Sequence, residues 1–183
     1  SYGMVRNDEE REMILKLHTL LKPNNINLIT PGFFRVKLIS GTFFNTCRNI
    51  FQLIQYKLTG MSFSRKPIDE NLMEKYFTAS DLVFIGRKKI LNSGNLPFAF
   101  ACGKIVVGPD TGNVGLILRE CGNPVFQVDD ENSIIKAINT GIELMKQGVG
   151  KQNKITAINK WSSELIAKEI AKLDIRLKNE ISL

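Results

Sequence analysis

The chain has 183 residues, 43% hydrophobic and 23% charged, with a formal net charge of +7 at pH 7. These values fit one globular domain with a full core and exclude a disordered or fibrous protein. No apolar run is long enough to span a bilayer, and the three cysteines and single histidine lack the spacing of a disulfide framework, a zinc site or a histidine-activated nucleophile.

The positive charge is unevenly distributed. No Asp or Glu occurs between Glu12 and Asp69, and a second acid-free stretch runs from Leu82 to Pro109. Such stretches concentrate anions near the surface, so they suit a nucleotide diphosphate, an anionic membrane or a nucleic acid.

The N-terminal third is predicted to alternate strands and helices. Ser1 to Val5 have the pattern of the end of a strand, so we expect the chain to be part of a longer protein. The next elements are a helix capped by Asn7 or Asp8 and ended by Pro23, a strand Ile26–Thr30 ended by Pro31–Gly32, a helix from about Thr42 to Leu58, a strand Met61–Ser64, and a helix from Asp69 to Thr78.

Residues 33 to 60 mix aromatic side chains with arginines and lysines. Aromatic residues at helical spacing are usually part of a core. Aromatic residues beside cations can also dock on an anionic membrane surface. Both interpretations, core helix and peripheral membrane contact, stay open.

The most informative stretch runs from Asp81 to Gly112. It combines a buried strand Leu82–Ile85, a basic loop Arg87–Lys89, a short helix opening at Ser93–Gly94 and a second strand Ile105–Val107. In parallel sheets, ligands bind beyond the carboxyl ends of the strands, and a helix start with unpaired N–H groups favours an anion. The alternative is that Ser93 only caps the helix and Gly94 only makes a turn.

The remaining sequence continues the alternation, with a helix Gly112–Glu120, a strand Pro124–Val128, a helix capped within Asp129–Ser133 and running to about Met145, and a last helix from about Asn153 that contains Trp161. This order is typical of an α/β fold with a doubly wound parallel sheet and helices on both faces. We expect one domain over residues 1–183, with residues 153–183 forming a terminal helix.

The central motifs resemble a known family. Tyr76-Phe77-x-Ala79-Ser80-Asp81, then Ser93-Gly94, then Ala99-x-Ala101-Cys102-Gly103-Lys104, then Asp110-x-Gly112 are similar to the donor-binding C-terminal half of GT-B glycosyltransferases, especially the retaining group labelled group 1 or family 4. The resemblance implies a Rossmann-like domain that binds a nucleotide diphosphate sugar. It also implies that the last helix packs on a partner domain, although Trp161 can equally be a plain packing anchor.

The resemblance also implies the residues of the site. Arg6 and Arg87 are the expected catalytic cations that stabilise the leaving phosphate. The remaining donor contacts are expected from Arg65, Asn92, Ser93, Gly94, Asn95, Leu96, Gly112 and Asn113. No metal or other cofactor is expected, because the chain has no Asp-x-Asp pair.

The sequence departs from the commoner family pattern at four positions. A usual lysine is replaced by Glu9, and three usual glutamates are replaced by Ile90, Phe98 and Leu116. A variant branch with an arginine and Ser-Gly in this loop also lacks the glutamate pair. Sugar and ribose hydroxyls are then expected to contact asparagines or the main chain.

Three functional hypotheses follow. The first is the donor half of a metal-independent hexosyltransferase in polysaccharide biosynthesis, using a UDP or GDP sugar and a glycan or lipid-linked acceptor held by a missing N-terminal domain. The second is an epimerase-like isomerase of nucleotide sugars, and the third a non-catalytic nucleotide-binding or membrane-docking domain. We expect a cytoplasmic protein, at the inner face of the membrane if it docks there, and no nucleic-acid partner.

Overall fold

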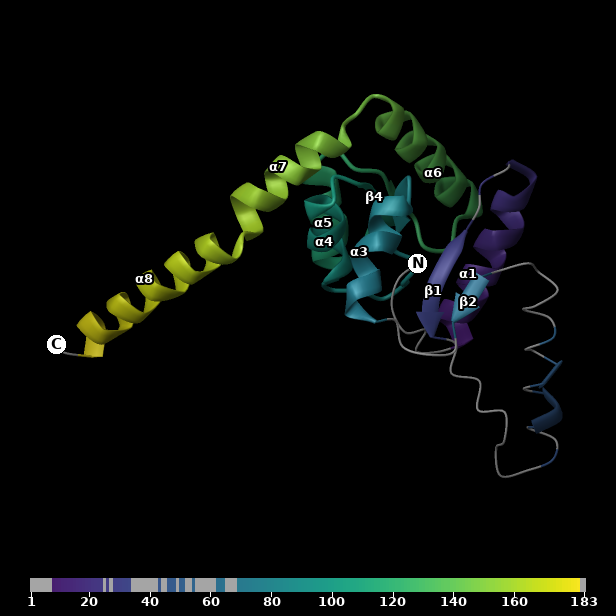
Figure 1. Ribbon diagram of the computed structural model, residues 1–183, viewed down its shortest axis with the longest axis horizontal. Helices are drawn as coiled ribbons and strands as arrows, with labels where there is room; N and C mark the ends of the chain where they lie inside the picture. Colours follow the sequence, from purple (N-terminus) through teal and green to yellow (C-terminus); the bar gives the residue numbers. More distant parts are fainter. Residues whose placement is uncertain are drawn as a thin grey trace.

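The computed structural model describes residues 8–24, 26, 28–33, 43, 46–48, 50–51, 54, 62–64 and 69–181. Two parallel sheets lie within these residues, one of strands β1 and β2 and one in the order β3-β4-β5 (Figure 1). The strands are β1 Ile29–Phe33, β2 Ser62–Ser64, β3 Leu82–Phe84, β4 Ile105–Pro109 and β5 Val125–Phe126.

Helices connect these strands. They are α1 Asp8–Leu21, followed by the 3-10 turn η1 Lys22–Asn24, then α3 Glu70–Ala79, α4 Asn95–Ala101, α5 Gly112–Glu120, α6 Glu131–Lys146, α7 Gly150–Trp161 and α8 Ser163–Ile181. Most of the predicted helix 42–58 lies outside the described residues, as does the predicted strand ending at Val5. The other predicted helices before residue 150 are confirmed to within a few residues.

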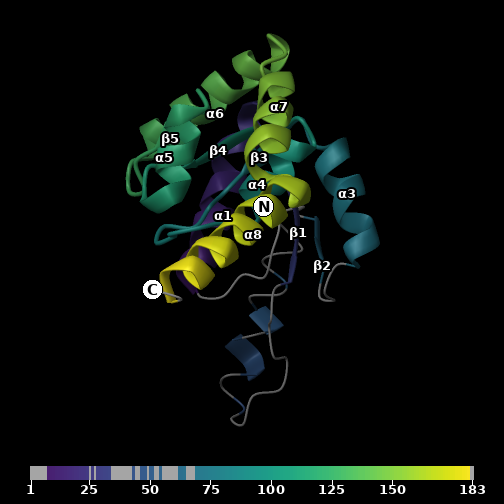
Figure 2. The same cartoon turned by 90° about the vertical axis from the view of Figure 1, so that its left-hand side faces the viewer.

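The three-stranded sheet has the predicted parallel topology. Leu82 pairs with Ile105 and Phe84 with Val107, while Gly108 pairs with Val125. Two helices, α4 and α5, make the crossover connections. The carboxyl ends of all three strands therefore meet at one edge, where α4, α5 and α6 begin. Figure 2 shows α3 at one flank of this sheet and β5 with α5 at the other.

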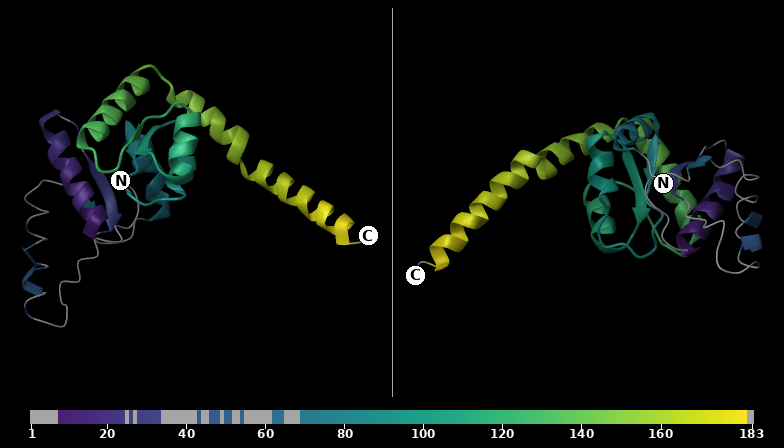
Figure 3. Two further views of the ribbon diagram at one scale, coloured as in Figure 1. Left: turned by 180° about the vertical axis from the view of Figure 1, so that it is seen from behind. Right: turned by 60° about the horizontal axis from the view of Figure 1, so that its bottom comes forward.

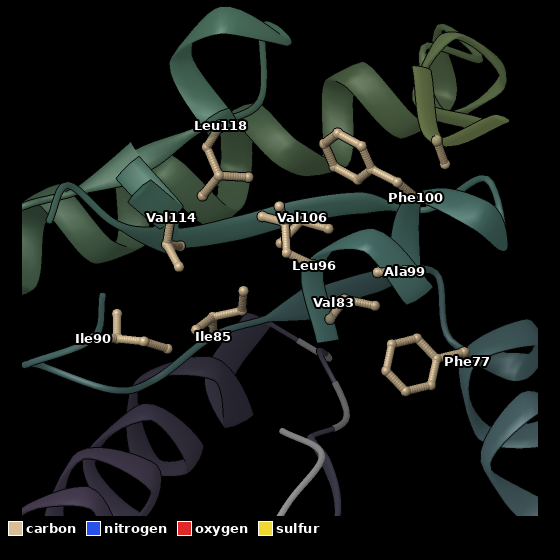
Figure 4. Packing of buried hydrophobic residues seen from close by; sticks show 11 residues of the cluster. Phe77, Val83, Ile85, Ile90, Leu96, Ala99, Phe100, Val106, Val114 and Leu118 are labelled. Atoms are coloured by element: carbon tan, nitrogen blue, oxygen red, sulfur yellow. The ribbon is translucent and has the colours of Figure 1, made fainter. Parts of the chain in front are cut away.

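Helices cover both faces of the sheet, as predicted. Side chains alternate along each strand, so neighbouring residues enter different cores. One core joins α1 and α6 to Phe84, Val107 and Phe126, with the rings of Phe84 and Phe126 stacked 5.2 Å apart. The other core joins α3, α4, α5 and α7 to strand residues that include Val83 and Val106 (Figure 4).

Strand β1 differs from the prediction. It runs from Ile29 to Phe33 and so passes through Pro31 and Gly32, which were expected to end it. The pairing with β2 shifts register between Thr30 and Phe33. Proline has no N–H to give to a sheet, and an irregularity in the ladder lets the strand continue past it.

The C-terminal segment forms two helices where one was predicted. α7 ends at Trp161 and α8 begins at Ser163, with an extended backbone at Ser162 between them. Figures 1 and 3 show α8 running away from the sheet. Trp161 packs on Phe100 at a ring distance of 5.7 Å, so it is a packing anchor within this chain. None of the described helices is both long and apolar enough to cross a membrane.

A buried polar cluster fixes α7 to the sheet. Asn123 and Asn153 are 5% and 0% exposed, and their amides exchange two hydrogen bonds of 2.9 and 3.0 Å. Asn123 also accepts from the N–H of Val106, and Asn153 donates to the carbonyl of Lys104. Buried amides are stable only when such partners are present, so this cluster specifies how α7 docks on the start of β4.

The three cysteines are free thiols in different environments. Burial raises the pKa of Cys102, with Glu74 adding to the rise, and burial likewise raises the pKa of Cys121. A raised thiol pKa lowers the thiolate fraction near neutral pH, and the thiolate is the reactive form. Because Cys47 is exposed, we expect iodoacetamide at pH 7.5 to label Cys47 first, measured by mass spectrometry of peptides. Equal labelling rates at all three cysteines would contradict the packing around α4 and α5.

Candidate functional site

The loops that follow β3 and β4 meet at the carboxyl edge of the sheet. The N–H of Asn113 donates to the carbonyl of Leu91 at 2.9 Å, and the Asn113 side chain donates to Asn92 Oδ1 at 2.8 Å. Gly112 has φ +56, and a Cβ built there would lie 2.4 Å from the carbonyl oxygen of Ile90. Glycine at 112 therefore permits the close approach of the two loops.

The helix starts at this edge differ in their capping. α6 is capped by Asp130, whose Oδ1 accepts from the N–H groups of Asn132 and Ser133. The preceding residues of α4 and α5 are Gly94 and Thr111, and neither gives a side-chain capping bond. In α4, Pro97 has no N–H and the N–H of Leu96 already donates to Ser93. The start of α5, where only the N–H of Asn113 is given to Leu91, is therefore the one whose helix dipole favours an anion.

The predicted residues Asn92 to Leu96 take different positions. Asn92 and Gly94 are exposed, and Ser93 and Asn95 are half-buried. No side-chain cap from Ser93 is formed, and its carbonyl instead accepts from the N–H of Leu96 at 3.2 Å. The Leu96 side chain is 2% exposed and lies in the core (Figure 4), so it anchors the start of α4 to the core.

Two of the three cations in the loop after β3 are held in ion pairs. Arg87 Nε lies 3.5 Å from Glu10 on α1, and Lys88 Nζ lies 3.0 Å from Asp129 in the loop before α6. Lys89 is exposed and makes no ion pair with any described residue. In the sequence these three residues form one basic loop, and only the fold shows that their ion-pair partners differ.

Asp110 is the acidic residue that follows β4 directly. The guanidinium of Arg119 pairs with it, and Gln127 Nε2 donates to its Oδ2 at 3.3 Å. A Cβ at Gly115 would lie 2.8 Å from the Asp110 main chain, so the first turn of α5 packs closely on this residue. Asp110 therefore joins the ends of β4 and β5 and fixes where α5 begins. The contacts of Asp110 could not be predicted from local sequence, because Arg119 and Gln127 are distant from it in the chain.

A small pocket of about 130 Å³ lies between α1 and the start of α6. The ion pairs Lys88–Asp129 and Lys16–Glu131 lie at its walls. Pockets for cofactors and drug-sized ligands usually measure about 300–1,000 Å³. This pocket is therefore too small for a nucleotide sugar, and the open surface at the starts of α4 and α5 is the better candidate site.

Arg6 and Arg65 lie outside the described residues, so their predicted roles stay predictions. Within the described part of the chain, no group of three or more histidine, cysteine or acidic side chains is arranged to hold a metal ion.

The solved structures that match this chain share one fold. No protein-family model and no curated protein matches the sequence. Among solved structures, sucrose-phosphate synthase from Thermosynechococcus elongatus matches 98% of this chain with a TM-score of 0.71 and 18% identity. HepE from Anabaena, in complex with UDP, matches 94% with a TM-score of 0.69 and 17% identity. The C-terminal domain of a group 1 glycosyl transferase, LpcC from Francisella tularensis, matches 88% with a TM-score of 0.59 and 12% identity.

The chain has the fold of a GT-B C-terminal domain. It spans 45% of the sucrose-phosphate synthase chain and 47% of the HepE chain, but 86% of the LpcC domain. The resemblance found in the sequence is thus confirmed at the level of fold.

Within this fold, the three positions at which the resembling family usually has glutamates are apolar and lie in different environments. Ile90 is 9% exposed and belongs to the core, and the ring of Phe98 packs edge-on against Phe77 at 4.8 Å. Leu116 is 46% exposed on α5. Two of the three replacements therefore stabilise the fold, while the third leaves an apolar side chain one helical turn beyond Gly112 and Asn113.

Proposed function

We propose that the chain is the donor-binding half of a glycosyltransferase that uses a nucleotide diphosphate sugar. The observation that carries this proposal is the start of α5, which has no side-chain cap and is joined to the loop after β3 at the carboxyl edge of the sheet by the contact between Leu91 and Gly112. The positive end of the α5 dipole then lies beside the exposed residues Asn92 and Asn113, an arrangement that suits the negative charge of a diphosphate.

The same surface can assist the reaction. Breaking the bond between the sugar and the diphosphate leaves negative charge on the phosphate, and preorganised N–H groups stabilise that charge as it grows. Removing one such donor typically raises a reaction barrier by about 2.7–4 kcal/mol. In this proposal Asn92 and Asn113 contact the hydroxyls of the sugar or ribose, and Arg6 and Arg65 add contacts to the donor. A second domain binds the glycan or lipid-linked acceptor.

The two alternatives have weaker support. A nucleotide-sugar epimerase of similar architecture usually carries paired glutamates after Ser-Gly-Gly, and this chain has Ile90 and Phe98 where the glutamate pair is expected. A non-catalytic nucleotide-binding or membrane-docking domain is compatible with the missing acids. Binding measurements separate these possibilities, because only the nucleotide-based hypotheses require selective affinity for a diphosphate.

The proposal is tested by calorimetric titration of the protein with UDP, GDP and ADP, each beside its nucleoside. We expect selective binding of one diphosphate, much weaker binding of its nucleoside, and binding that persists at moderate salt. Equal, salt-sensitive binding of all three nucleotides would indicate only a basic surface. No binding of any of them would contradict the proposed donor site.

A charge placed at the start of α5 gives a sharper test. Asn113→Asp should weaken diphosphate binding by about tenfold, because a carboxylate at this helix start repels an anion and competes for the same N–H groups. The matched control is Asn132→Asp, which makes the same change at the second residue of α6. Both residues are exposed, so both variants should fold. Similar losses in the two variants would show that the effect is one of net charge only.

A further inference from the structure

The loop after β3 places three consecutive cations at the edge of the proposed donor site. They differ in whether they form ion pairs with other described residues. Arg87, Lys88 and Lys89 carry the same charge and lie within one short segment. An anion entering the site gains most from a cation that has no other partner. The structure allows the three to be distinguished by their partners.

Arg87 and Lys88 are committed to other elements. Their side chains are each 28% exposed, and they pair with Glu10 and Asp129 respectively. Glu10 is itself 16% exposed, so releasing Arg87 to a ligand would leave a largely buried carboxylate without this cation. These two pairs tie the loop to α1 and to the loop before α6. They are positioning contacts for the segment between them and the start of α4.

Lys89 differs from both. It is exposed, and no ion pair joins it to any residue in the described part of the chain. The next residue, Ile90, is buried in the core, while Leu91 beyond it is 66% exposed. Lys89 and Leu91 therefore both lie on the outer surface of the loop, with Ile90 anchored beneath them.

Lys89 also lies close in the chain to the loop residue that contacts the start of α5. The main chain of Leu91, two residues on, contacts Gly112 and accepts the hydrogen bond from Asn113. Consecutive Cα atoms are about 3.8 Å apart, and the lysine ammonium sits on a flexible four-carbon stem. The ammonium can therefore approach an anion seated at the start of α5 without any change in the backbone.

We propose that Lys89 is the side chain of this loop that contacts the diphosphate of the donor, while Arg87 and Lys88 hold the loop in place. This inference rests on the proposed function and goes beyond it, because it assigns the charge-neutralising contact to one of three adjacent cations.

The test compares Lys89→Ala with Lys151→Ala, which changes an exposed lysine on α7 near the start of β4. Both variants remove one positive charge, so any difference between them comes from position and not from net charge. The probe is whichever of UDP, GDP and ADP the unmodified protein binds most tightly, together with its nucleoside. We expect Lys89→Ala to weaken diphosphate binding by about tenfold, as for one lost charge-assisted hydrogen bond, and Lys151→Ala by less than about threefold.

Three further measurements separate a ligand contact from a structural role. Lys89→Ala should leave nucleoside binding and the melting temperature unchanged, and it should reduce the salt dependence of diphosphate binding. Lys89→Arg should recover most of the lost affinity, since it restores the charge. Equal losses in Lys151→Ala and Lys89→Ala, or an unaltered affinity in Lys89→Ala, would overturn the inference while leaving the donor site standing. A protein that binds none of the three diphosphates would instead overturn the proposed function itself.

Discussion

Replacing Gly112 with alanine should lower the free energy of unfolding by about 2–4 kcal/mol and abolish diphosphate binding. Two effects combine. The backbone at Gly112 has φ +56, which a Cβ disfavours, and that Cβ would lie 2.4 Å from the Ile90 carbonyl and 2.9 Å from the Leu91 Cα. These neighbours are backbone atoms, so they cannot rotate away. Relief requires the two loops to separate, which removes the hydrogen bond from Asn113 to Leu91.

Chemical denaturation and calorimetry together measure this prediction, and the chain supplies matched controls. Gly122 and Gly148 also have positive φ values, of 67 and 77, but a Cβ at either would meet nothing within 4 Å. Alanine at these sites should cost only about 1 kcal/mol, the strain of the backbone alone, and should leave ligand binding intact. If Gly112→Ala proves no more costly than these controls, the close contact between the loops is absent in solution.

Replacing Asn153 with alanine should destabilise the protein by about 3 kcal/mol, although the residue is far from the proposed ligand surface in the chain. The substitution removes two hydrogen bonds to Asn123 and one to the Lys104 carbonyl, and Asn123 keeps only its bonds to Val106 and Cys121. It also leaves a cavity where a fully buried side chain was. The melting temperature and the denaturant midpoint both report this loss.

The control for Asn153 lies on the same helix. Asn159 is exposed on α7, and Asn159→Ala should change stability by less than about 0.5 kcal/mol. A double-mutant cycle with Asn123→Ala should show strong coupling, because the first substitution already breaks the paired amides. Additive losses would indicate that the two asparagines act independently, contrary to the hydrogen bonds between them.

Much of this fold follows from local pattern. The alternation of apolar segments at strand and helix periods predicts the order of elements, and capping residues such as Asp69 and Asp130 predict where α3 and α6 begin. The predicted end of β1 at Pro31 was wrong. Proline usually ends a strand, but here the pairing of β1 with β2 shifts register at this point and the strand continues. The break at Ser162 has no glycine or proline to signal it.

The site was less predictable, because its geometry depends on contacts between distant segments. The pattern around Ser93 and Gly112 predicts that their two loops face a ligand, and the fold joins these loops through Leu91 and Asn113. The partners of Arg87 and Lys88 lie on α1 and before α6, so no local signal distinguishes these residues from Lys89. The place of Asp110 between Arg119 and Gln127 is equally non-local.

The junction at Ser162 determines where the last helix points. α7 is fixed to the body by Asn153, Ala157 and Trp161, whereas every side chain from Ser163 to Asp174 is exposed. Ser162 takes part in both helices, since its extended backbone ends α7 while its carbonyl and hydroxyl accept from Ile166 and Leu165. The backbone torsion angles of Ser162 therefore set the direction of α8, which is 19 residues long. A few degrees of rotation at Ser162 would displace the far end of α8 while the sheet and both helix starts stay in place.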